Sequence, residues 1–477
     1  MVVINKKRQI GLALLFILSI RMFYGCTEGI VPDPSVTGET LKVNKFIKDA
    51  MSDIYLWYDQ LPNIDYTKQP DPKQYFNSLL YEDDKWSYIT DDVDALENSF
   101  QGIETSFGWS LAFGTFTNTG NWFAIVEYVY PNTPADNAGI KRGDIIVLMD
   151  DESITKDNYS DLINGESIKI TLGVLGNDGI STGSSVSISA QELQLNPVLK
   201  TTVIEESGHK IGYLFYAQYI EKYNDAIDTA LQSLMNQNIT DLVLDLRYNP
   251  GGTIWAAQHL CSSLAPIEYV NESAKLVTYQ WNDKYQDFWE SKQEADQLQV
   301  DFDNTVPVKL DLDKIHILTG YGTASASELT ITGLSAYMTV TTVGDTTYGK
   351  YTASVTLKPE NYYESKSYYS EINNWGLQPI VLRYANAWGV TDFKDGFAPT
   401  YPVYDDLFNA FPLGDVNDPL LKAAIEDITG TIIIAAKSAK KSTIPYKLLD
   451  RGFSKFDKNK RNLLIDNNNA ERIRNQF

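Results

Sequence analysis

The sequence predicts a multidomain α/β protein in which a small helical unit, a mostly β domain and an α/β core follow one another. Its 477 residues are enough for about two to four domains. Hydrophobic residues make up 43% and charged residues 21% of the chain, which are ordinary values for a packed globular protein. The apolar periodicity changes between residues 41–100, 101–195 and 196–430, and these changes divide the chain.

The net charge and the few cysteines and histidines exclude several classes of protein. The net charge is −22, opposite to that of a protein that binds a phosphate backbone, so no nucleic acid partner is expected. Cys26 and Cys261 cannot build a disulfide framework or a cysteine-rich zinc site. Three histidines lie far apart and match no metal-ligand spacing: His209, His259 and His316. The sequence therefore predicts no metal site, and we expect His259 and His316 to be packed core residues.

Residues 1–25 are typical of a secretory signal peptide. A basic start precedes an 11-residue apolar run at residues 10–20, which is too short for a bilayer that needs about 20 apolar residues. Gly25 before Cys26 resembles the lipobox of bacterial lipoproteins, which implies that Cys26 carries a lipid after cleavage. The protein would then be a periplasm-facing or outer-membrane lipoprotein of the cell envelope, with Cys261 as a buried thiol. An ordinary signal peptide or a short anchor is the alternative.

Two further segments at the ends of the chain differ in composition from the rest. Residues 26–40 are rich in Pro, Thr and Glu and are expected to form a tether. Residues 431–477 hold 11 Lys/Arg against 4 Asp/Glu, a charge of +7 that leaves −29 on residues 1–430. We expect this basic tail to be a solvated, partly disordered extension, and a specific anionic partner is the alternative.

An amphipathic helix opens the helical unit of residues 41–100. Its apolar residues recur at alternating steps of three and one, which places them on one helical face: Val43, Phe46, Ile47, Ala50, Met51, Ile54, Tyr55 and Tyr58. Pro62 and Pro70 break this pattern, and a second helix is predicted at about residues 73–80.

Residues 101–195 are predicted to form a mostly β domain. Three apolar runs are separated by turns rich in Gly, Asn, Asp and Pro: residues 124–129, 145–148 and 168–172. Residues 131–154, PNTPADNAGIKRGDIIVLMDDESI, resemble the second half of a bacterial PDZ domain, in which a short helix ends at Gly139.

A glycine loop upstream of these strands extends the resemblance. Phe107, Gly108 and Trp109 resemble the carboxylate-binding loop of PDZ domains, in which apolar residues flank a glycine. Glycine lets backbone N–H groups point at a ligand carboxylate, and the neighbouring strand edge accepts an extended peptide. The resemblance implies that these three residues bind the C-terminal segment of a polypeptide. A purely structural packing role is the alternative.

Residues 196–430 alternate between strands and helices, as in an α/β domain with covered sheets. The predicted elements are a strand at 211–216, a helix over 226–235, a strand at 242–246 and a helix over 254–264.

A glycine-rich turn follows the strand at residues 242–246. Gly251 and Gly252, after a proline, permit a tight turn with exposed backbone N–H groups, which is one way to build an oxyanion hole. The alternative is a strand-to-helix turn in which glycine is merely permissive. Asp245 and Arg247 are expected to form a structural ion pair near the end of the strand.

Ser325 stands between a predicted strand at residues 315–318 and a predicted helix. A serine at such a junction exposes its hydroxyl, and the positive helix end with the N–H of Ala326 can stabilise an oxyanion. A simple helix N-cap is the alternative.

Lys350 follows Ser325 by 25 residues, and no histidine stands in a context that suggests a base for this serine. A lysine can act as the base if burial lowers its pKa from about 10.4 toward neutrality. A shift of about 3 units costs about 4 kcal/mol, so Lys350 would need a dry pocket. An exposed surface charge is the alternative.

Together these motifs resemble the C-terminal processing peptidases, also called tail-specific proteases. The PDZ-like region and the segments NPGG, TASASE and YGK occur in the family's order. Further stretches look familial: residues 56–59, 76–80, 395–400, 412–415 and 418–424. The resemblance implies a protease core of the crotonase-like, tail-specific type, a polypeptide substrate, and no metal or organic cofactor.

The resemblance also implies a role for each site residue. Ser325 would be the nucleophile, Lys350 the general base, and Glu328 an acidic residue that helps to position the site. A glycine of the NPGG turn and the Ala326 N–H would supply the oxyanion hole. Several family members carry a glutamine four residues after the lysine that orients it, whereas this chain has the shorter Ser354.

The leading hypothesis is a secreted, lipid-anchored serine endopeptidase whose PDZ domain recognises substrate C-termini. A non-catalytic peptide-binding lipoprotein on the same fold is the first alternative, because Ser354 replaces the orienting glutamine. A glycan-handling lipoprotein, suggested by the 58 aromatic residues, is the second. The sequence does not indicate whether the protein is a monomer or an oligomer.

Overall fold

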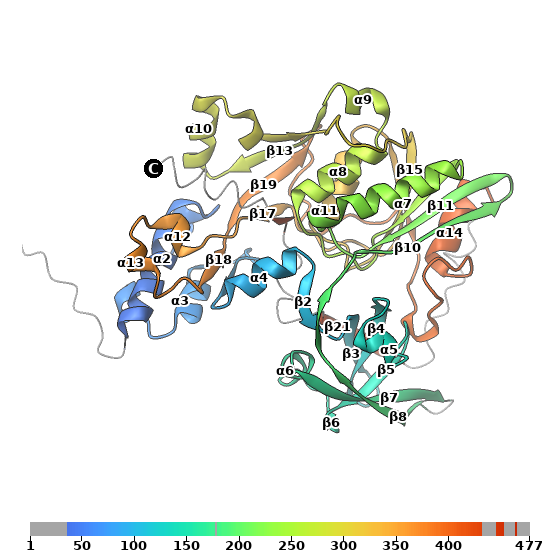
Figure 1. The fold of residues 1–477 in the computed structure, drawn as a ribbon, viewed down its shortest axis with the longest axis horizontal. Helices are drawn as coiled ribbons and strands as arrows, with labels where there is room; N and C mark the ends of the chain where they lie inside the picture. The colour runs from blue at the N-terminus through green and yellow to red at the C-terminus, as the bar shows by residue number, and fades with distance from the viewer. Residues whose placement is uncertain (1–35, 177–178, 432–444, 453–462, 465–477) are drawn as a thin grey trace, which may run out of the picture.

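The computed structural model describes residues 36–176, 179–431, 445–452 and 463–464. The predicted signal peptide, Cys26 and most of the predicted tether lie outside these residues. The structure confirms the multidomain α/β class: a helical N-terminal unit and a β domain pack against different sides of an α/β core (Figure 1). Within the described parts of the chain, no helix combines the length and the apolar character needed to cross a bilayer.

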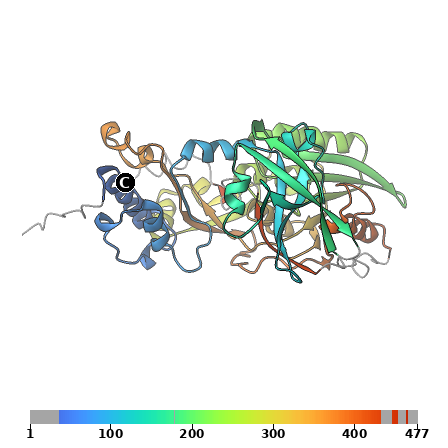
Figure 2. The ribbon, with the colours of Figure 1, turned by 90° about the horizontal axis from the view of Figure 1, so that it is seen from below.

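Three helices form most of the N-terminal unit: α2 (Gly38–Asp53), α3 (Pro72–Leu79) and α4 (Val93–Phe100). Helix α2 begins inside the predicted tether. The predicted apolar stripe is buried from Val43 to Tyr55, but the helix ends before Tyr58 is reached. The chain leaves the helix because it joins the core, where Leu56 N–H donates to the Ile380 carbonyl at 2.9 Å. Figure 2 shows this unit at one end of the molecule.

The β domain is one antiparallel sheet in the order β21-β3-β4-β5-β7-β8. Its strands from residues 101–195 are β3 (Trp109–Phe116), β4 (Trp122–Val129), β5 (Ile145–Met149), β7 (Ser167–Gly176) and β8 (Gly179–Ser189). The three predicted strands of this region are therefore confirmed. Two short helices complete the domain, α5 (Pro134–Asn137) and α6 (Tyr159–Ile163), and β2 (Ile103–Ser106) pairs with β9 (Gln191–Gln194) where the chain enters and leaves it.

The core is built on a six-stranded sheet in the order β10-β11-β12-β15-β16-β20, parallel from β11 to β20. Its strands are β10 (Val198–Glu206), β11 (His209–Tyr216), β12 (Asp241–Asp245), β15 (Lys314–Thr319), β16 (Thr339–Gly344) and β20 (Tyr401–Pro402). Four helices cover it: α7 (Asn224–Asn236), α8 (Ile254–Leu264), α11 (Ala326–Ser335) and α14 (Pro419–Ile428). The predicted strand–helix alternation is confirmed.

The two faces of this sheet bury different partners. Leu244 and Ile317 belong to the apolar cluster that contains the buried residues of α7, α8 and α11. Val243 and Leu318, their neighbours along the strands, belong to the cluster that contains α14 and residues of the β domain. The alternation of side chains along each strand thus places helices on one face and the β domain with α14 on the other.

A second sheet, in the order β14-β13-β19-β17-β22, joins the core to the helical unit. Its strands are β13 (Lys275–Trp281), β14 (Gln299–Asp301), β17 (Thr352–Ser354), β19 (Ile380–Asn386) and β22 (Leu463–Leu464). Beside it, β18 (Gly376–Gln378) pairs with β1 (Tyr88–Thr90) of the N-terminal unit.

The expectation of a solvated basic tail is wrong for two of its segments. Strand β21 (Tyr446–Gly452) pairs antiparallel with β3 and becomes the edge of the β domain. Strand β22 pairs in parallel with β17 in the second sheet. Edge strands with unpaired backbone groups recruit any extended segment that can reach them, which charge composition does not predict. The remainder of the tail lies outside the described residues.

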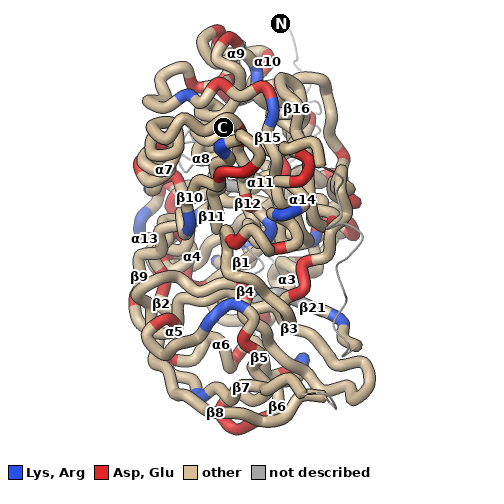
Figure 3. Tube along the Cα trace, turned by 90° about the vertical axis from the view of Figure 1, so that its right-hand side faces the viewer, with Lys and Arg blue, Asp and Glu red and all other residues tan. Residues whose placement is uncertain are grey.

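Acidic and basic residues are interspersed along the described chain. Figure 3 shows red Asp and Glu segments over the core and the β domain, with blue Lys and Arg segments between them. This distribution agrees with the net charge of −22.

Candidate active site

Ser325 lies at the sharp junction between β15 and α11. Its φ of 61° and ψ of −111° place a non-glycine residue in the left-handed half of backbone space, a strained conformation that persists only where the surroundings enforce it. The side chain is fully buried, and its Oγ has no hydrogen-bond partner among the described residues. The predicted strand–serine–helix arrangement is confirmed. The expectation that this serine exposes its hydroxyl is wrong, because the surrounding segments bury Oγ and leave it unengaged inside the protein.

The two glycines of the NPGG turn are required by close approach. A Cβ on Gly251 would lie 2.7 Å from the Cβ of Ser325 and 2.9 Å from the backbone nitrogen of Ala326. A Cβ on Gly252 would lie 1.9 Å from the carbonyl oxygen of Tyr219. Gly251 therefore packs against the Ser325 side chain and the Ala326 nitrogen, and Gly252 packs against Tyr219. The N–H of Gly251 already donates to Oδ1 of Asn249 at 2.9 Å.

Lys350 lies in the loop between β16 and β17 and is also fully buried. Burial lowers the pKa of its ammonium group well below the usual value, although Asp84 and Glu328 act in the opposite direction. Its Nζ lies 5.8 Å from the centroid of the Trp86 ring. This environment favours the neutral amine, which is the form that can accept a proton.

Glu328 joins the backbones of Ser325 and Lys350. Its Oε2 accepts from the N–H of Ser325 and from the N–H of Lys350, both at 2.8 Å. Its Oε1 accepts from the Thr347 hydroxyl and from the Gly349 N–H, both at 2.6 Å. Burial raises the pKa of this carboxyl to about 7, against the lowering effect of these four hydrogen bonds. One carboxylate thus holds the two loops at a fixed separation.

Tyr384, on β19, makes a second link between the same loops. Its hydroxyl donates to the carbonyl oxygens of Ser325 and Lys350, each at 3.1 Å. The structure therefore brings together Ser325 and Lys350, which the sequence singled out, through two side chains, Glu328 and Tyr384. Tyr384 lies 59 residues from Ser325, and no local pattern in the sequence marks it.

Asp84 and Trp86 are further site residues that the sequence reasoning did not assign. They come from the N-terminal unit and complete the surroundings of Lys350. Asp84 is held in place because its Oδ2 accepts from the Tyr55 hydroxyl at 2.7 Å. Only the tertiary packing of the N-terminal unit on the core brings them to the lysine, so no sequence signal could have found them.

Ser354 is buried on β17, at a β-bulge that opens between it and Ala353. Gln378 of β18 is buried as well, and its amide donates to the Thr356 hydroxyl, two residues after Ser354, at 3.0 Å. The base-orienting role of Ser354 stays a prediction.

The loop of Phe107, Gly108 and Trp109 is packed into the β domain. Phe107 and Trp109 are buried with ring centroids 5.3 Å apart. A Cβ on Gly108, whose φ is 82°, would lie 2.3 Å from the Cβ of Thr133. The two aromatic side chains are therefore packed in the interior of the domain and are not available to a ligand. A ligand can contact only the backbone of the loop and the β3 strand that follows it.

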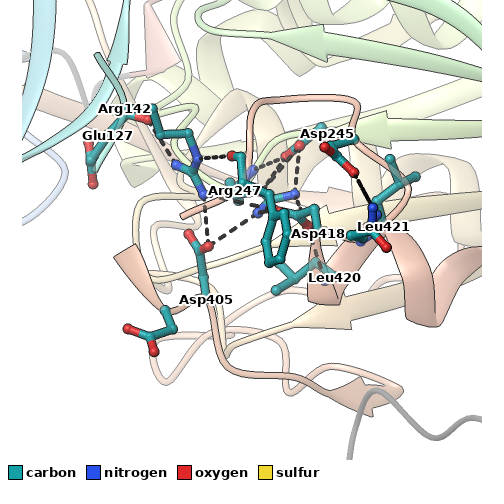
Figure 4. A network of polar contacts seen from close by, with 12 residues as sticks. Glu127, Arg142, Asp245, Arg247, Asp405, Asp418, Leu420 and Leu421 are labelled. Carbon is teal, nitrogen blue, oxygen red and sulfur yellow. Dashed lines mark hydrogen bonds and ion pairs between the residues drawn. The ribbon is translucent and has the colours of Figure 1, made fainter. Parts of the chain in front are cut away.

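A buried ionic network joins the β domain to the core (Figure 4). The predicted Asp245–Arg247 pair is confirmed, with Nε of Arg247 3.0 Å from Oδ1 of Asp245. Arg247 also contacts Asp418 at 2.9 Å and Asp405 at 3.3 Å. Asp405 in turn contacts Arg142 at 2.9 Å, from the turn before β5. The network therefore fixes the β domain beside the strand that leads to the NPGG turn.

Asp418→Asn is expected to lower the free energy of unfolding by about 3–5 kcal/mol, because it removes one charge from a buried ion pair. Asp418 accepts from both terminal nitrogens of Arg247 and from two N–H groups at the start of α14. Urea unfolding measures the effect. Asp415→Asn, which changes a less buried carboxylate of the same loop, should change stability by less than about 0.5 kcal/mol. Equal effects of the two substitutions would contradict the prediction.

His259, His316 and Cys261 lie in ordinary packed positions. Nε2 of His316 lies 2.7 Å from Asp427, and Nε2 of His259 lies 2.8 Å from Asp228. Cys261 is fully buried, and burial raises the pKa of its thiol to about 12. These predictions are confirmed.

Glu328→Gln is expected to lower the free energy of unfolding by about 1–3 kcal/mol, because the amide NH2 would face hydrogen-bond donors that now have a carboxylate oxygen. All four partners of Glu328 donate to it. Urea unfolding at neutral pH tests this, with the exposed Glu166→Gln as the control. A loss of stability no larger than that of the control would show that the carboxylate does not hold the loops.

Three regions of the chain match known families. Residues 210–399 match Peptidase family S41, residues 42–88 match the Peptidase S41 N-terminal domain, and residues 125–172 match the PDZ domain. These matches support the C-terminal processing peptidases of family S41 as the family of this chain. Both Ser325 and Lys350 lie within the S41 match.

Individual relatives agree with this assignment. The chloroplastic carboxyl-terminal-processing peptidase 2 of Arabidopsis thaliana is 25% identical over 65% of this chain and 55% of the relative. A carboxyl-terminal-processing protease of Synechocystis is 24% identical over 66% of each chain. A crystal structure assigned to the S41 proteases, from Bacteroides fragilis NCTC 9343, superposes with a TM-score of 0.65 at 27% identity, over 81% of this chain and 97% of that one.

The matched regions place the residues of the candidate site in two parts of the chain. Asp84 and Trp86 fall in the N-terminal domain match, whereas Ser325 and Lys350 fall in the S41 match. The PDZ match begins inside β4, so the loop of residues 107–109 precedes it. The chain spans 55% and 66% of the lengths of the two curated relatives.

Proposed function

We propose that this S41 family member is a serine endopeptidase in which Ser325 is the nucleophile and Lys350 the general base. One observation carries the proposal: Glu328 binds the backbone N–H groups of both residues at 2.8 Å, in a buried site where the lysine pKa is lowered. A fold that needed only packing would have no reason to bury an unengaged serine hydroxyl and a lysine beside the same carboxylate.

The reaction follows from these groups. The neutral Nζ of Lys350 takes the proton from Oγ of Ser325 as Oγ attacks the scissile carbonyl. The N–H groups of Ala326 and Gly252 are the proposed oxyanion donors, since the N–H of Gly251 is engaged by Asn249. The lysine then protonates the leaving amine as the scissile C–N bond breaks. In the second half of the reaction it takes a proton from the water that attacks the acyl-enzyme, and returns this proton to Oγ of Ser325 as the bond between Oγ and the acyl carbon breaks.

The site is closed in this structure. Ser325 and Lys350 are both fully buried, so a polypeptide can reach Oγ only after the surrounding segments move. We therefore expect the reactivity of Ser325 to depend on bound substrate, as it does in enzymes whose catalytic group is exposed by conformational change.

A fluorophosphonate probe, followed by mass-spectrometric mapping, tests the nucleophile. The protein is labelled in the presence of unfolded casein, and the label is expected on Ser325. Ser327→Ala, which removes the neighbouring buried hydroxyl that donates to the Asn249 carbonyl at 3.0 Å, should label like the wild type. If casein binds but stays intact and Ser325 stays unlabelled, the chain is a non-catalytic peptide-binding protein and the proposal fails.

The proposal extends to substrate recognition and location. The PDZ domain would recognise the C-termini of polypeptides, and the chain would be secreted and anchored through a lipid on Cys26, because of the signal-like start and the Gly25–Cys26 pair. Cys26→Ser is then expected to move the protein from the membrane fraction to the soluble fraction of a bacterial host. Unchanged fractionation would rule out the lipid anchor.

A further inference from the structure

One edge of the PDZ domain is occupied by the chain's own tail. Strand β3 begins directly after the loop of residues 107–109 and pairs through one edge with β4. Its other edge carries β21, which pairs antiparallel from Tyr446 opposite Phe116 to Gly452 opposite Leu111 (Figure 1). The tail therefore completes a sheet that would otherwise end at β3.

The direction of β21 is the direction that a peptide ligand would take. A peptide that adds a strand to β3 with its C-terminal end at the loop must run antiparallel to β3. Strand β21 does so, and its residue numbers increase from Phe116 toward Leu111, that is, toward the loop. Since a strand edge can pair with only one partner at a time, β21 and such a peptide exclude each other.

The start of β21 is anchored to the domain. The N–H of Thr117 donates to the carbonyl of Pro445 at 2.9 Å. The Tyr446 ring packs against Phe408 with centroids 4.4 Å apart and against Phe123 with centroids 6.0 Å apart. These contacts hold one end of the strand at the end of β3 that is farther from the loop.

The middle of β21 is held mainly through its backbone. Leu448 is 43% exposed and Leu449 is 41% exposed, and Lys447 is exposed as well. The register slips at Leu449, between Leu448 opposite Gly114 and Asp450 opposite Phe113. Because these side chains lose little apolar contact when the strand leaves, local release of β21 costs far less than unfolding of the domain.

We propose that residues 445–452 are an intramolecular ligand of the PDZ peptide edge, and that a polypeptide C-terminus binds this edge by displacing them. The inference rests on the proposed function in one respect, namely that the PDZ domain takes substrate C-termini. It adds the occupant of the edge and the chemistry that the edge prefers.

The surroundings of β21 indicate an extended ligand with apolar and basic side chains. Leu448 and Leu449 line a cavity of 810 Å³ that is also lined by Glu127 and Asp345 and by Asp405, whose carboxylate is already paired with Arg142 and Arg247. Arg247, which lines it too, is already paired with buried carboxylates. Residues 445–452 hold Lys447 and Arg451 against Asp450, whereas residues 1–430 carry −29, so charge as well as strand pairing favours a segment of this type.

The tail also reaches the strand that follows the proposed base. Leu463 and Leu464 pair in parallel with Ala353 and Ser354 of β17, which begins two residues after Lys350. The tail thus contacts both the PDZ edge and the sheet of the proposed active site.

A pair of substitutions at Lys447 separates backbone pairing from side-chain effects. Because hydrogen-bonded pairs alternate along an antiparallel ladder, the Thr117–Pro445 bond makes Lys447 and Thr115 the next hydrogen-bonded pair. Lys447→Pro removes the N–H of this pair, whereas Lys447→Ala removes only an exposed side chain. Both are made in the full chain with Ser325→Ala, so that no bound peptide is cleaved.

The probe is a fluorescein-labelled peptide, PYKLLDRG, which has the sequence of residues 445–452 and a free C-terminal carboxylate. Fluorescence anisotropy should show at least about 10-fold tighter binding to Lys447→Pro than to Lys447→Ala, because an edge that is free for a larger fraction of the time binds with a proportionally lower apparent Kd. Equal affinities of two folded variants would overturn the proposal.

Hydrogen–deuterium exchange gives a test that needs no change in the tail. Saturating peptide added to Ser325→Ala should raise exchange in residues 446–452 while the amides of β3 stay protected. Unchanged exchange in residues 446–452 at saturation, or no binding at millimolar peptide, would overturn the proposal.

Failure of the proposed function looks different. If casein stays intact with the wild-type chain while PYKLLDRG still releases β21, the proposed peptidase activity is wrong and the proposal of an intramolecular ligand stands. If cleavage depends on Ser325 but β21 is never released, the proposed peptidase activity stands and the proposal of an intramolecular ligand is wrong.

Discussion

Ser325→Ala is expected to lower kcat for polypeptide hydrolysis by at least about 10⁴-fold, because Oγ of Ser325 is the proposed nucleophile that forms the acyl-enzyme. The substitution removes only Oγ, which has no hydrogen-bond partner among the described residues, so the loop and its contacts with Glu328 and Tyr384 should persist. Initial rates on casein, measured with active-site-titrated wild type, check the prediction. Retention of more than a tenth of the wild-type rate would remove Ser325 from its role.

Ser325→Gly is the matched control for folding. The residue has a φ of 61°, which glycine adopts without strain, whereas alanine keeps the strain of a Cβ. Both variants should be inactive, and Ser325→Gly should be more stable than Ser325→Ala by about 1 kcal/mol in urea unfolding. A glycine variant less stable than the alanine variant would mean that the turn is not strained.

Lys350→Met is expected to abolish hydrolysis and, at neutral pH, to raise the free energy of unfolding. The first effect follows because methionine cannot accept the Ser325 proton, and a loss of at least about 10⁴-fold in kcat is expected. The second follows because methionine fills the same space without the cost of burying an amine whose pKa is lowered by desolvation. Initial rates and urea unfolding measure the two effects separately.

The pH dependence of this stability difference has a definite sign. The folded pKa of Lys350 lies below its unfolded value of about 10.4, so between these values the unfolded chain binds more protons. The wild-type free energy of unfolding therefore contains a part that rises with pH in this range. Lys350→Met lacks it, and its advantage should be largest at neutral pH and shrink toward pH 10. An advantage that stays constant with pH would contradict the lowered pKa.

The same lysine predicts how activity depends on pH. Because only the neutral amine can act as the base, kcat/KM should rise through the lowered pKa of Lys350 and then level off. The rise should occur well below the range of an ordinary lysine.

Much of the site could be predicted from short stretches of sequence. A strand, a small-residue turn and a helix around Ser325 form wherever the local pattern demands them, and so does the glycine turn at residues 250–252. Glu328 was singled out through the family resemblance. In the structure it lies three residues into a helix, the position from which an acidic side chain reaches back to the backbone N–H before it. These features depend on neighbours in sequence.

The remaining site residues could not be predicted, because they act across long separations. Asp84 and Trp86 reach Lys350 only when the N-terminal unit packs on the core. Tyr384 binds the carbonyls of Ser325 and Lys350 from a strand of the second sheet. In the sequence, none of these three residues stands in a motif or a periodic pattern that would distinguish it from an ordinary core residue.

The tail shows the same limit in the fold. Its composition predicted a solvated extension. Composition does not indicate which strand edges of the folded protein the tail can reach. Strand β3 has a free edge only because the rest of the PDZ sheet lies on its other side, and β21 pairs there through backbone groups that every residue carries.

By itself the sequence determined the order of the units and the α/β class, because apolar periodicity and glycine turns act within a few residues. Its short motifs also singled out Ser325, Glu328 and Lys350 through a family resemblance. The tertiary structure alone decided that Lys350 and Ser325 are fully buried and that the tail pairs with the edge of the PDZ sheet. Desolvation and strand pairing depend on which distant segments come together, and only the folded chain specifies that.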